Sequence, residues 1–69
     1  MRNRIQLFRW KKGWSQQQLA NKSGVSKSVI SSLENQRTLH PTIDVAYKLS
    51  KALEVYVFDI FYEEEEKEM

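Results

Sequence analysis

The 69-residue sequence contains no cysteine, one histidine, one proline and two glycines. Without cysteine the chain can form neither a disulfide framework nor a thiolate metal site, and His40 alone cannot hold zinc. No apolar run approaches the roughly 18–20 residues that span a membrane, and the N-terminus lacks the apolar stretch of a signal peptide. We therefore expect one cytoplasmic domain without a membrane segment, metal, other cofactor or small-molecule ligand.

Acidic residues are almost absent from the first part of the chain. Residues 1–40 contain eight lysines and arginines but a single acid, Glu34, whereas residues 41–69 contain three lysines and eight acids. A polyanion such as DNA would be attracted to the first part only. Five of the acids fall in residues 63–69, which have no apolar periodicity. This composition predicts a disordered acidic tail after a domain that spans residues 1–62.

Apolar residues recur every three or four positions in the domain, which is the period of an amphipathic helix. The sequence predicts an all-α fold, a compact bundle of about five short helices. The first covers roughly residues 3–12, and the last covers about 57–62. In the last two helices we expect the buried side chains to be Ile43, Ala46, Leu49, Ser50, Leu53, Val57, Ile60 and Phe61.

The segment Gln16–Asn35 carries the most specific pattern in the sequence. Ser15 and Gln18 have the spacing of a capping box, which starts a helix, and Gly24 permits the positive φ of a sharp turn after it. A second helix then presents one apolar and one polar face. The polar face is small and serine-rich, and it consists of Ser28, Ser31, Ser32 and Asn35. Two short helices joined by a tight turn predict a helix-turn-helix, with the second as recognition helix.

This pattern resembles the lambda-repressor-like helix-turn-helix family, of the Cro or xenobiotic-response-element type, over about residues 4–61. The residues that carry the resemblance are Gln16, Leu19, Ala20, Gly24, Val25, Ile30, Leu33, Glu34 and Asn35. The chain departs from the family where Ser23 replaces an apolar residue and where Gln36 and Glu54 replace glycines. Either Asn35 or Gln36 must therefore take the left-handed conformation after the recognition helix.

The resemblance implies a set of DNA contacts. The expected base-contacting residues are Lys27, Ser28 and Ser32, and lysine can donate to guanine O6 and N7. The expected phosphate-contacting residues are Gln16, Asn35 and Arg37. Lys27 could equally hold a phosphate, and the serines could be plain helix surface.

The resemblance also implies a structural ion pair between Arg9 and Glu34, which would tie the first helix to the motif. The alternative is that both are solvated surface charges.

Two groups of apolar residues leave alternatives open. Four aromatics lie near the C-terminus. Because the family often dimerises through its last helix, we expect them to form a dimer interface. The alternative is that they complete a small core. They are Tyr56, Phe58, Phe61 and Tyr62. In the first helix, Leu7 and Trp10 lie outside the core stripe. Trp10 either packs on Trp14 or the C-terminal segment, or forms an exposed patch for a partner.

Taken with the resemblance to phage and bacterial repressors, the sequence predicts a DNA-binding transcriptional regulator. It would act as a repressor and bind a palindromic operator in double-stranded DNA as a homodimer. The alternative is a protein-interaction module, such as an antitoxin or an adaptor, that uses the exposed aromatics. An enzyme is not expected, because the sequence has no nucleophile–histidine arrangement, metal cluster or glycine-rich phosphate loop.

Overall fold

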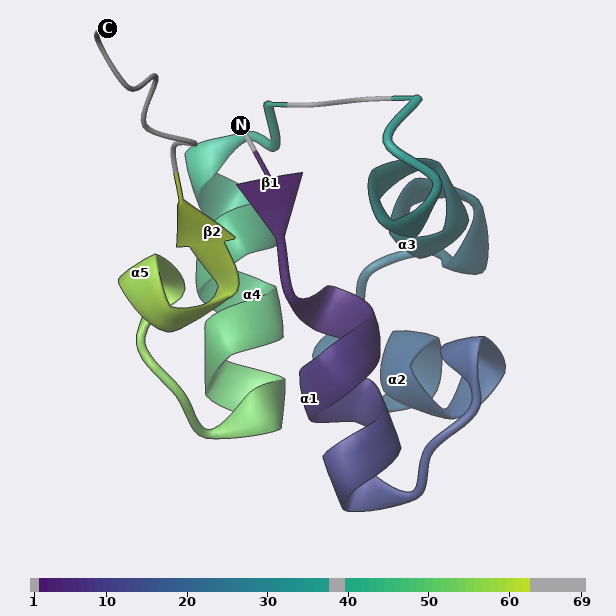
Figure 1. The fold of residues 1–69 in the computed structure, drawn as a ribbon. Helices are drawn as coiled ribbons and strands as arrows, with labels where there is room; N and C mark the ends of the chain where they lie inside the picture. Colours follow the sequence, from purple (N-terminus) through teal and green to yellow (C-terminus); the bar gives the residue numbers. More distant parts are fainter. Residues whose placement is uncertain (1, 38–39, 63–69) are drawn as a thin grey trace, which may run out of the picture.

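The computed structural model describes residues 2–37 and 40–62, which form five helices and a two-stranded ribbon (Figure 1). The elements follow in the order β1 (Arg2–Asn3), α1 (Ile5–Lys12), α2 (Gln16–Ser23), α3 (Lys27–Glu34), α4 (Ile43–Leu53), α5 (Val57–Ile60) and β2 (Phe61–Tyr62). Both α1 and α2 pack against α3 and α4. The helical fold class is therefore confirmed. The expected tail at 63–69 lies outside the described residues, and within them no helix is long and apolar enough to cross a bilayer.

Hydroxyl side chains start three of the helices, as expected for good N-cap residues. At α2, Ser15 Oγ accepts from Gln18 N at 3.1 Å, and Gln18 Oε1 accepts from Ser15 N at 2.8 Å, which completes the predicted capping box. Ser26 Oγ accepts from Val29 N at the start of α3, and Thr42 Oγ1 accepts from Val45 N at the start of α4. Local sequence therefore fixes where each of these helices begins.

Each of the helices α1 to α4 is followed by a residue in the left-handed conformation. After α3, Gln36 has φ +59°, while Asn35 has φ −87°. Arg37 N donates to Ser32 O at 2.8 Å and Gln36 N donates to Leu33 O at 3.1 Å, which is the Schellman pattern. Of the two alternatives left by the sequence, Gln36 adopts the strained conformation. Glu54 does so after α4, with φ +60°.

The ribbon was not predicted from the sequence. β1 pairs antiparallel with β2, so that Asn3 lies opposite Phe61. Asn3 Oδ1 accepts from Ile5 N at 3.2 Å, so α1 begins at Ile5 and not at residue 3. Asn3 Nδ2 also donates to Leu33 O at 2.9 Å. The Asn3 side chain thereby ties the ribbon to the C-terminal end of α3.

The core contains most of the expected apolar residues. It consists of Ile5, Leu19, Ala20, Val25, Ile30, Leu33, Ala46, Leu49, Leu53, Ile60 and Phe61. The prediction for Ile43 is wrong, because its side chain is 89% exposed. Ile43 is the first residue of α4, and it lines a groove of about 190 Å³ between α4 and α5.

The outer face of α1 carries an exposed apolar pair. Trp10 is 62% exposed and Leu7 is 45% exposed, which favours the exposed patch of the two alternatives that the sequence left open. Trp14 is covered instead by lysines, because the ammonium groups of Lys12 and Lys22 each lie 5.7 Å from its ring.

The left-handed turn after α3 yields a stability prediction. A residue with a Cβ loses about 1 kcal/mol in this conformation, and Gln36 is exposed. Gln36→Gly should therefore raise the free energy of unfolding by about 0.5–1 kcal/mol, and the melting temperature by a few degrees. Gln36→Ala is the control and should give no gain, because it keeps the Cβ. A glycine variant that melts at or below the wild-type temperature would contradict this account.

Candidate nucleic-acid interface

The turn between α2 and α3 is held by backbone and hydroxyl contacts. Gly24 has φ +79° and donates its N–H to Ala20 O at 2.9 Å. Val25 is buried, and its N–H donates to Ser23 Oγ at 3.1 Å. Ser23, which departs from the family pattern, thus contributes a hydrogen bond to the turn where an apolar residue would contribute packing.

Helix α3 presents a polar face opposite its buried side. Ile30 and Leu33 are fully buried, whereas Lys27 and Ser28 are exposed and Ser32 is half-buried. Ser28 and Ser32 lie four positions apart and therefore share one face. Beside them is a hollow of about 290 Å³ between α3 and the start of α4. It is lined by Ser28, Val29, Ser32, Leu33, His40, Pro41, Thr42 and Val45. The structure thus places Ser28 and Ser32 on one accessible face of α3, and exposed Lys27 lies at the start of the helix beside that face.

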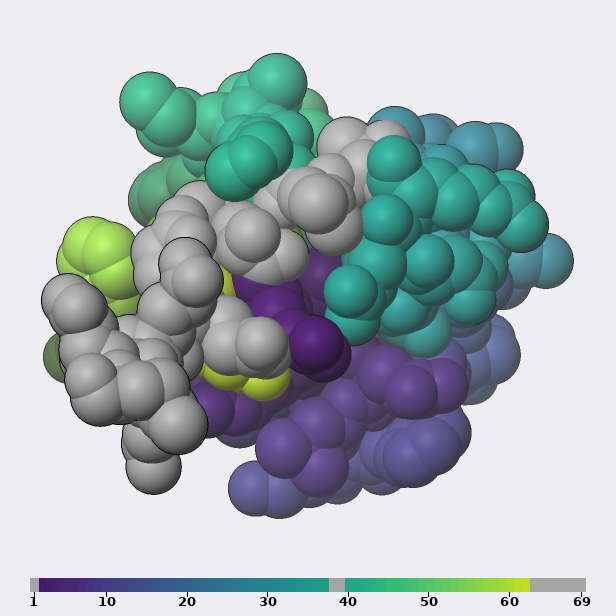
Figure 2. All heavy atoms as spheres, turned by 45° about the horizontal axis from the view of Figure 1, so that its top comes forward, coloured from purple at the N-terminus to yellow at the C-terminus, as the bar shows by residue number. Residues whose placement is uncertain are grey.

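The expected phosphate-contacting residues lie at the ends of the two motif helices. Gln16 is the first residue of α2, where the backbone N–H groups of the first turn have no partner within the helix. Asn35 and Arg37 are exposed beyond the end of α3, and Asn35 Nδ2 donates to Ser31 Oγ at 3.2 Å. Figure 2 shows the end of α3 and the turn after it, in teal, projecting at the surface beside the purple N-terminal segment.

Arg9 and Glu34 form a bidentate ion pair. Arg9 Nε donates to Glu34 Oε2 at 2.8 Å and Arg9 Nη2 donates to Glu34 Oε1 at 2.9 Å. The side chains are 9% and 4% exposed, so these are not solvated surface charges. Arg9 Nη1 also donates to Trp14 O at 2.9 Å. The hydrogen bonds that Arg9 donates to Glu34 raise the pKa of the Arg9 guanidinium above its ordinary value, although burial opposes the shift.

A second partner of Glu34 was not anticipated from the sequence. Gln16 Nε2 donates to Glu34 Oε1 at 3.1 Å, which joins the first residue of α2 to the last residue of α3. No sequence signal indicated that Asn3 would bond to Leu33 either. Both contacts join residues far apart in the chain, so local spacing does not reveal them.

The C-terminal aromatics do not share one surface. Phe58 is 87% exposed and Tyr56 is 81% exposed, whereas Phe61 is 5% exposed and packs in the core. The expectation that Phe61 forms a surface interface is therefore corrected: β2 turns its side chain inward. Tyr62 is half-buried, and the Arg4 guanidinium stacks over its ring at 4.2 Å.

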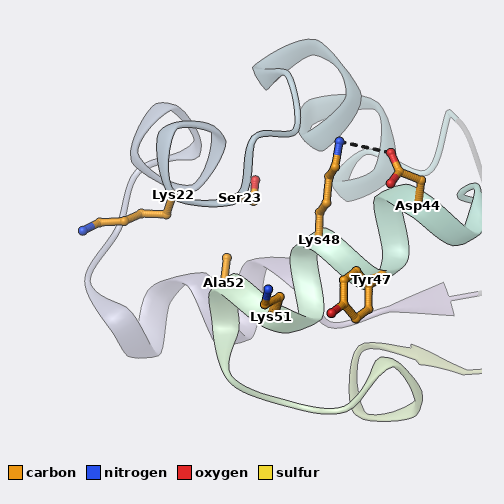
Figure 3. Close-up of a pocket in the computed structure, with 7 residues that line it drawn as sticks. All are labelled: Lys22, Ser23, Asp44, Tyr47, Lys48, Lys51 and Ala52. Carbon is orange, nitrogen blue, oxygen red and sulfur yellow. Dashed lines mark ion pairs between the residues drawn. The ribbon is translucent and has the colours of Figure 1, made fainter.

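A separate hollow of about 450 Å³ between α2 and α4 is lined by three lysines among other residues (Figure 3). Lys48 pairs with Asp44 at 3.1 Å, and Lys22 points away from the other labelled side chains. The lysines therefore do not converge on a common point, as an anion site requires.

In the described part of the chain, no group of three His, Cys, Asp or Glu side chains is placed to hold a metal ion.

The chain belongs to the helix-turn-helix family, because residues 5–60 match that family's model. It is 40% identical over 65 residues to the HTH-type transcriptional regulator SinR of Bacillus licheniformis, a match that covers 94% of this chain and 59% of SinR. It is 36% identical over 67 residues to an uncharacterized HTH-type transcriptional regulator of Archaeoglobus fulgidus, with 97% and 94% of the two chains covered. The chain thus spans little more than half of SinR but nearly all of the archaeal relative.

Solved structures give the same family assignment. The fold is similar to the SinR protein/SinI protein complex, with a TM-score of 0.75 and 41% identity over 78% of this chain and 52% of that chain. It is also similar to a hypothetical transcription factor, NHTF, from Neisseria, with a TM-score of 0.73 and 33% identity over 80% and 61% of the two chains. These matches confirm the resemblance carried by the motif at Gln16–Asn35.

Proposed function

We propose that this protein is a sequence-specific DNA-binding transcriptional regulator in the cytoplasm. The observation that carries the proposal is the exposed polar face of α3, flanked by the N-terminus of α2 and by the turn after α3. The names of SinR and of the archaeal relative as transcriptional regulators support it. The excess of basic residues in positions 1–40 supports it as well, because DNA is a polyanion.

The proposed contacts divide into two kinds. Gln16, Asn35 and Arg37 would hold phosphates on either side of the major groove and so fix the register of the protein on the duplex. The bases would be contacted by Lys27, Ser28 and Ser32 from the groove itself. Lysine favours guanine, whereas a serine hydroxyl both donates and accepts, so Lys27 would supply most of the discrimination at its position.

We infer that the protein acts as a homodimer on a palindromic operator and represses by occlusion. Two copies related by a two-fold axis would place their α3 helices about 34 Å apart, in successive major grooves on one side of the duplex. The surface that favours a second copy is the groove between α4 and α5. It is mostly apolar, and exposed Ile43 and Phe58 stand beside it, with Tyr56 nearby in the chain. Aromatic anchors at a groove are typical of dimer interfaces.

A protein-interaction module is the second candidate function. The observation that favours it is the exposed pair Leu7 and Trp10 on α1, outside the helices that carry the proposed DNA contacts. An antitoxin or adaptor would bury this pair against its partner. DNA binding weakens steeply as salt rises, whereas an apolar interface responds little, so the two functions respond differently to salt.

Selection from random duplex DNA tests the proposed function directly. We expect the wild type to enrich a two-fold symmetric motif. Lys27→Ala should weaken binding to that motif by about 10–100-fold, and it should relax the preference at one position in each half-site. Lys51→Ala is the charge-matched control, because Lys51 lies on α4 in the separate hollow. Equal losses for the two lysine variants, or no enriched motif at low salt, would contradict specific contact by α3.

Sedimentation equilibrium tests the proposed dimer. Phe58→Asp should weaken self-association by at least about 30-fold, since a buried aromatic anchor contributes about 2 kcal/mol or more. Its affinity for an isolated half-site should remain near that of the wild type. Trp10→Asp is the control, as it places the same charge on the other exposed apolar surface. Loss of self-association in Trp10→Asp but not in Phe58→Asp would assign the interface to α1.

A further inference from the structure

Glu34 has more partners than an ion pair requires. Its carboxylate accepts from Arg9 Nε, from Arg9 Nη2 and from Gln16 Nε2, at 2.8, 2.9 and 3.1 Å. The Gln16 contact shares Oε1 with Arg9 Nη2. Because the Glu34 side chain is only 4% exposed, water does not compete freely for these positions. The last residue of α3 is thus hydrogen-bonded to the side chain that begins α2.

The chemistry of this contact fixes the orientation of the Gln16 amide. A glutamine side chain ends in a donor NH₂ and an acceptor oxygen, and rotation by half a turn exchanges them. A carboxylate only accepts, so only the NH₂ end can face Glu34. One Nε2 hydrogen is then used on Glu34, and the other stays available to an outside acceptor. An unrestrained amide could instead turn its oxygen toward a phosphate, which would repel it.

Arg9 makes this arrangement compatible with DNA. Glu34 is the only acid in residues 1–40, and a free carboxylate at the DNA-facing end of α2 would repel phosphates. The bidentate contact with Arg9 offsets that charge while leaving Oε1 able to accept from Gln16. The ion pair therefore supplies an oriented acceptor without a net negative charge.

We propose that Glu34 is a positioning residue for DNA binding: it holds the Gln16 amide with its donor end toward the phosphate that α2 contacts. This role rests on the proposed function. It makes the N-terminus of α2 a prearranged phosphate site, in which a side-chain N–H adds to the backbone N–H groups of Gln16 and Gln17, while that of Gln18 is bonded to Ser15. Ordering a glutamine before DNA arrives also removes part of the entropic cost of binding.

A double-mutant cycle on one selected duplex at fixed salt tests the role. Gln16→Ala should weaken binding about tenfold in the wild type, as expected for a hydrogen bond to a charged group. In the near-isosteric background Glu34→Gln, the same change should weaken binding no more than about twofold, because the amide is no longer oriented. A full tenfold loss in both backgrounds would overturn the proposal.

Two further measurements separate positioning from loss of fold. Ile60→Val destabilises the core without touching the ion pair, because Ile60 lies on α5. In that background Gln16→Ala should still weaken DNA binding about tenfold. In the free protein, ¹H–¹⁵N spectra should show one Gln16 Nε2 hydrogen shifted downfield by the Glu34 carboxylate and exchanging slowly with water. Gln17, whose amide bonds to exposed Asn21, is the internal control for the chemical shift and the exchange rate. A Gln16 amide with the same shifts and exchange rate as that of Gln17 would also overturn the proposal.

The outcomes distinguish this inference from the function on which it rests. A wild type that binds no duplex overturns the DNA-binding function, and the positioning role with it. A wild type that binds specifically, with an additive cycle, overturns the positioning role alone.

Discussion

The buried contact between Arg9 and Glu34 determines how the helix-turn-helix is held. It joins α1 to the end of α3, and it reaches the loop before α2 through Trp14 and α2 itself through Gln16. Two charges taken out of water are costly unless they are paired and hydrogen-bonded. Once they are paired, removal of either partner leaves an uncompensated buried charge, at a cost of about 3–5 kcal/mol. In a domain of this size that is a large share of the total stability, so the placement of α3 depends on the pair.

The same pair explains how a small domain can present a precise surface. A chain of 69 residues buries few apolar side chains, and the core of this protein contains eleven. The apolar contacts of α3 come from Ile30 and Leu33, which leaves its outer face free for small polar residues. The hydrogen bonds to Glu34 and the bond from Asn3 to Leu33 fix the position of the C-terminal end of α3. Apolar packing alone has no such directional preference.

Sequence reasoning succeeded where the determinants are local. The capping box at Ser15, the turn at Gly24 and the faces of α3 all follow from spacing within one or two turns of helix. It failed where the determinants are distant. Ile43 fits the periodicity of α4, but no element of the described residues covers it, and the pairing of β1 with β2 was not predicted. Periodicity correctly predicted that Phe61 is buried, so only its assignment to the dimer interface was wrong.

The candidate site shows the same division. The helix face with Ser28 and Ser32 could be assigned from periodicity, whereas the role of Lys27 and the partnership of Arg9 with Glu34 came from the family resemblance. The bond from Gln16 to Glu34 could not be predicted, because it depends on how closely two helix ends approach. The choice between Asn35 and Gln36 depends on the hydrogen-bond pattern that ends α3. In the Schellman ending the left-handed residue is the one after the cap, which is Gln36.

The most direct test of this account is a titration of the ¹⁵N-labelled protein with a selected palindromic duplex, followed by ¹H–¹⁵N correlation spectra. The account predicts the largest shifts at the start of α2, along the outer face of α3 and in the turn at residues 35–37. It predicts little change at Leu7 and Trp10. Shifts concentrated on the outer face of α1, or none at low salt, would contradict a DNA interface built on α2 and α3 and would favour a protein partner on α1.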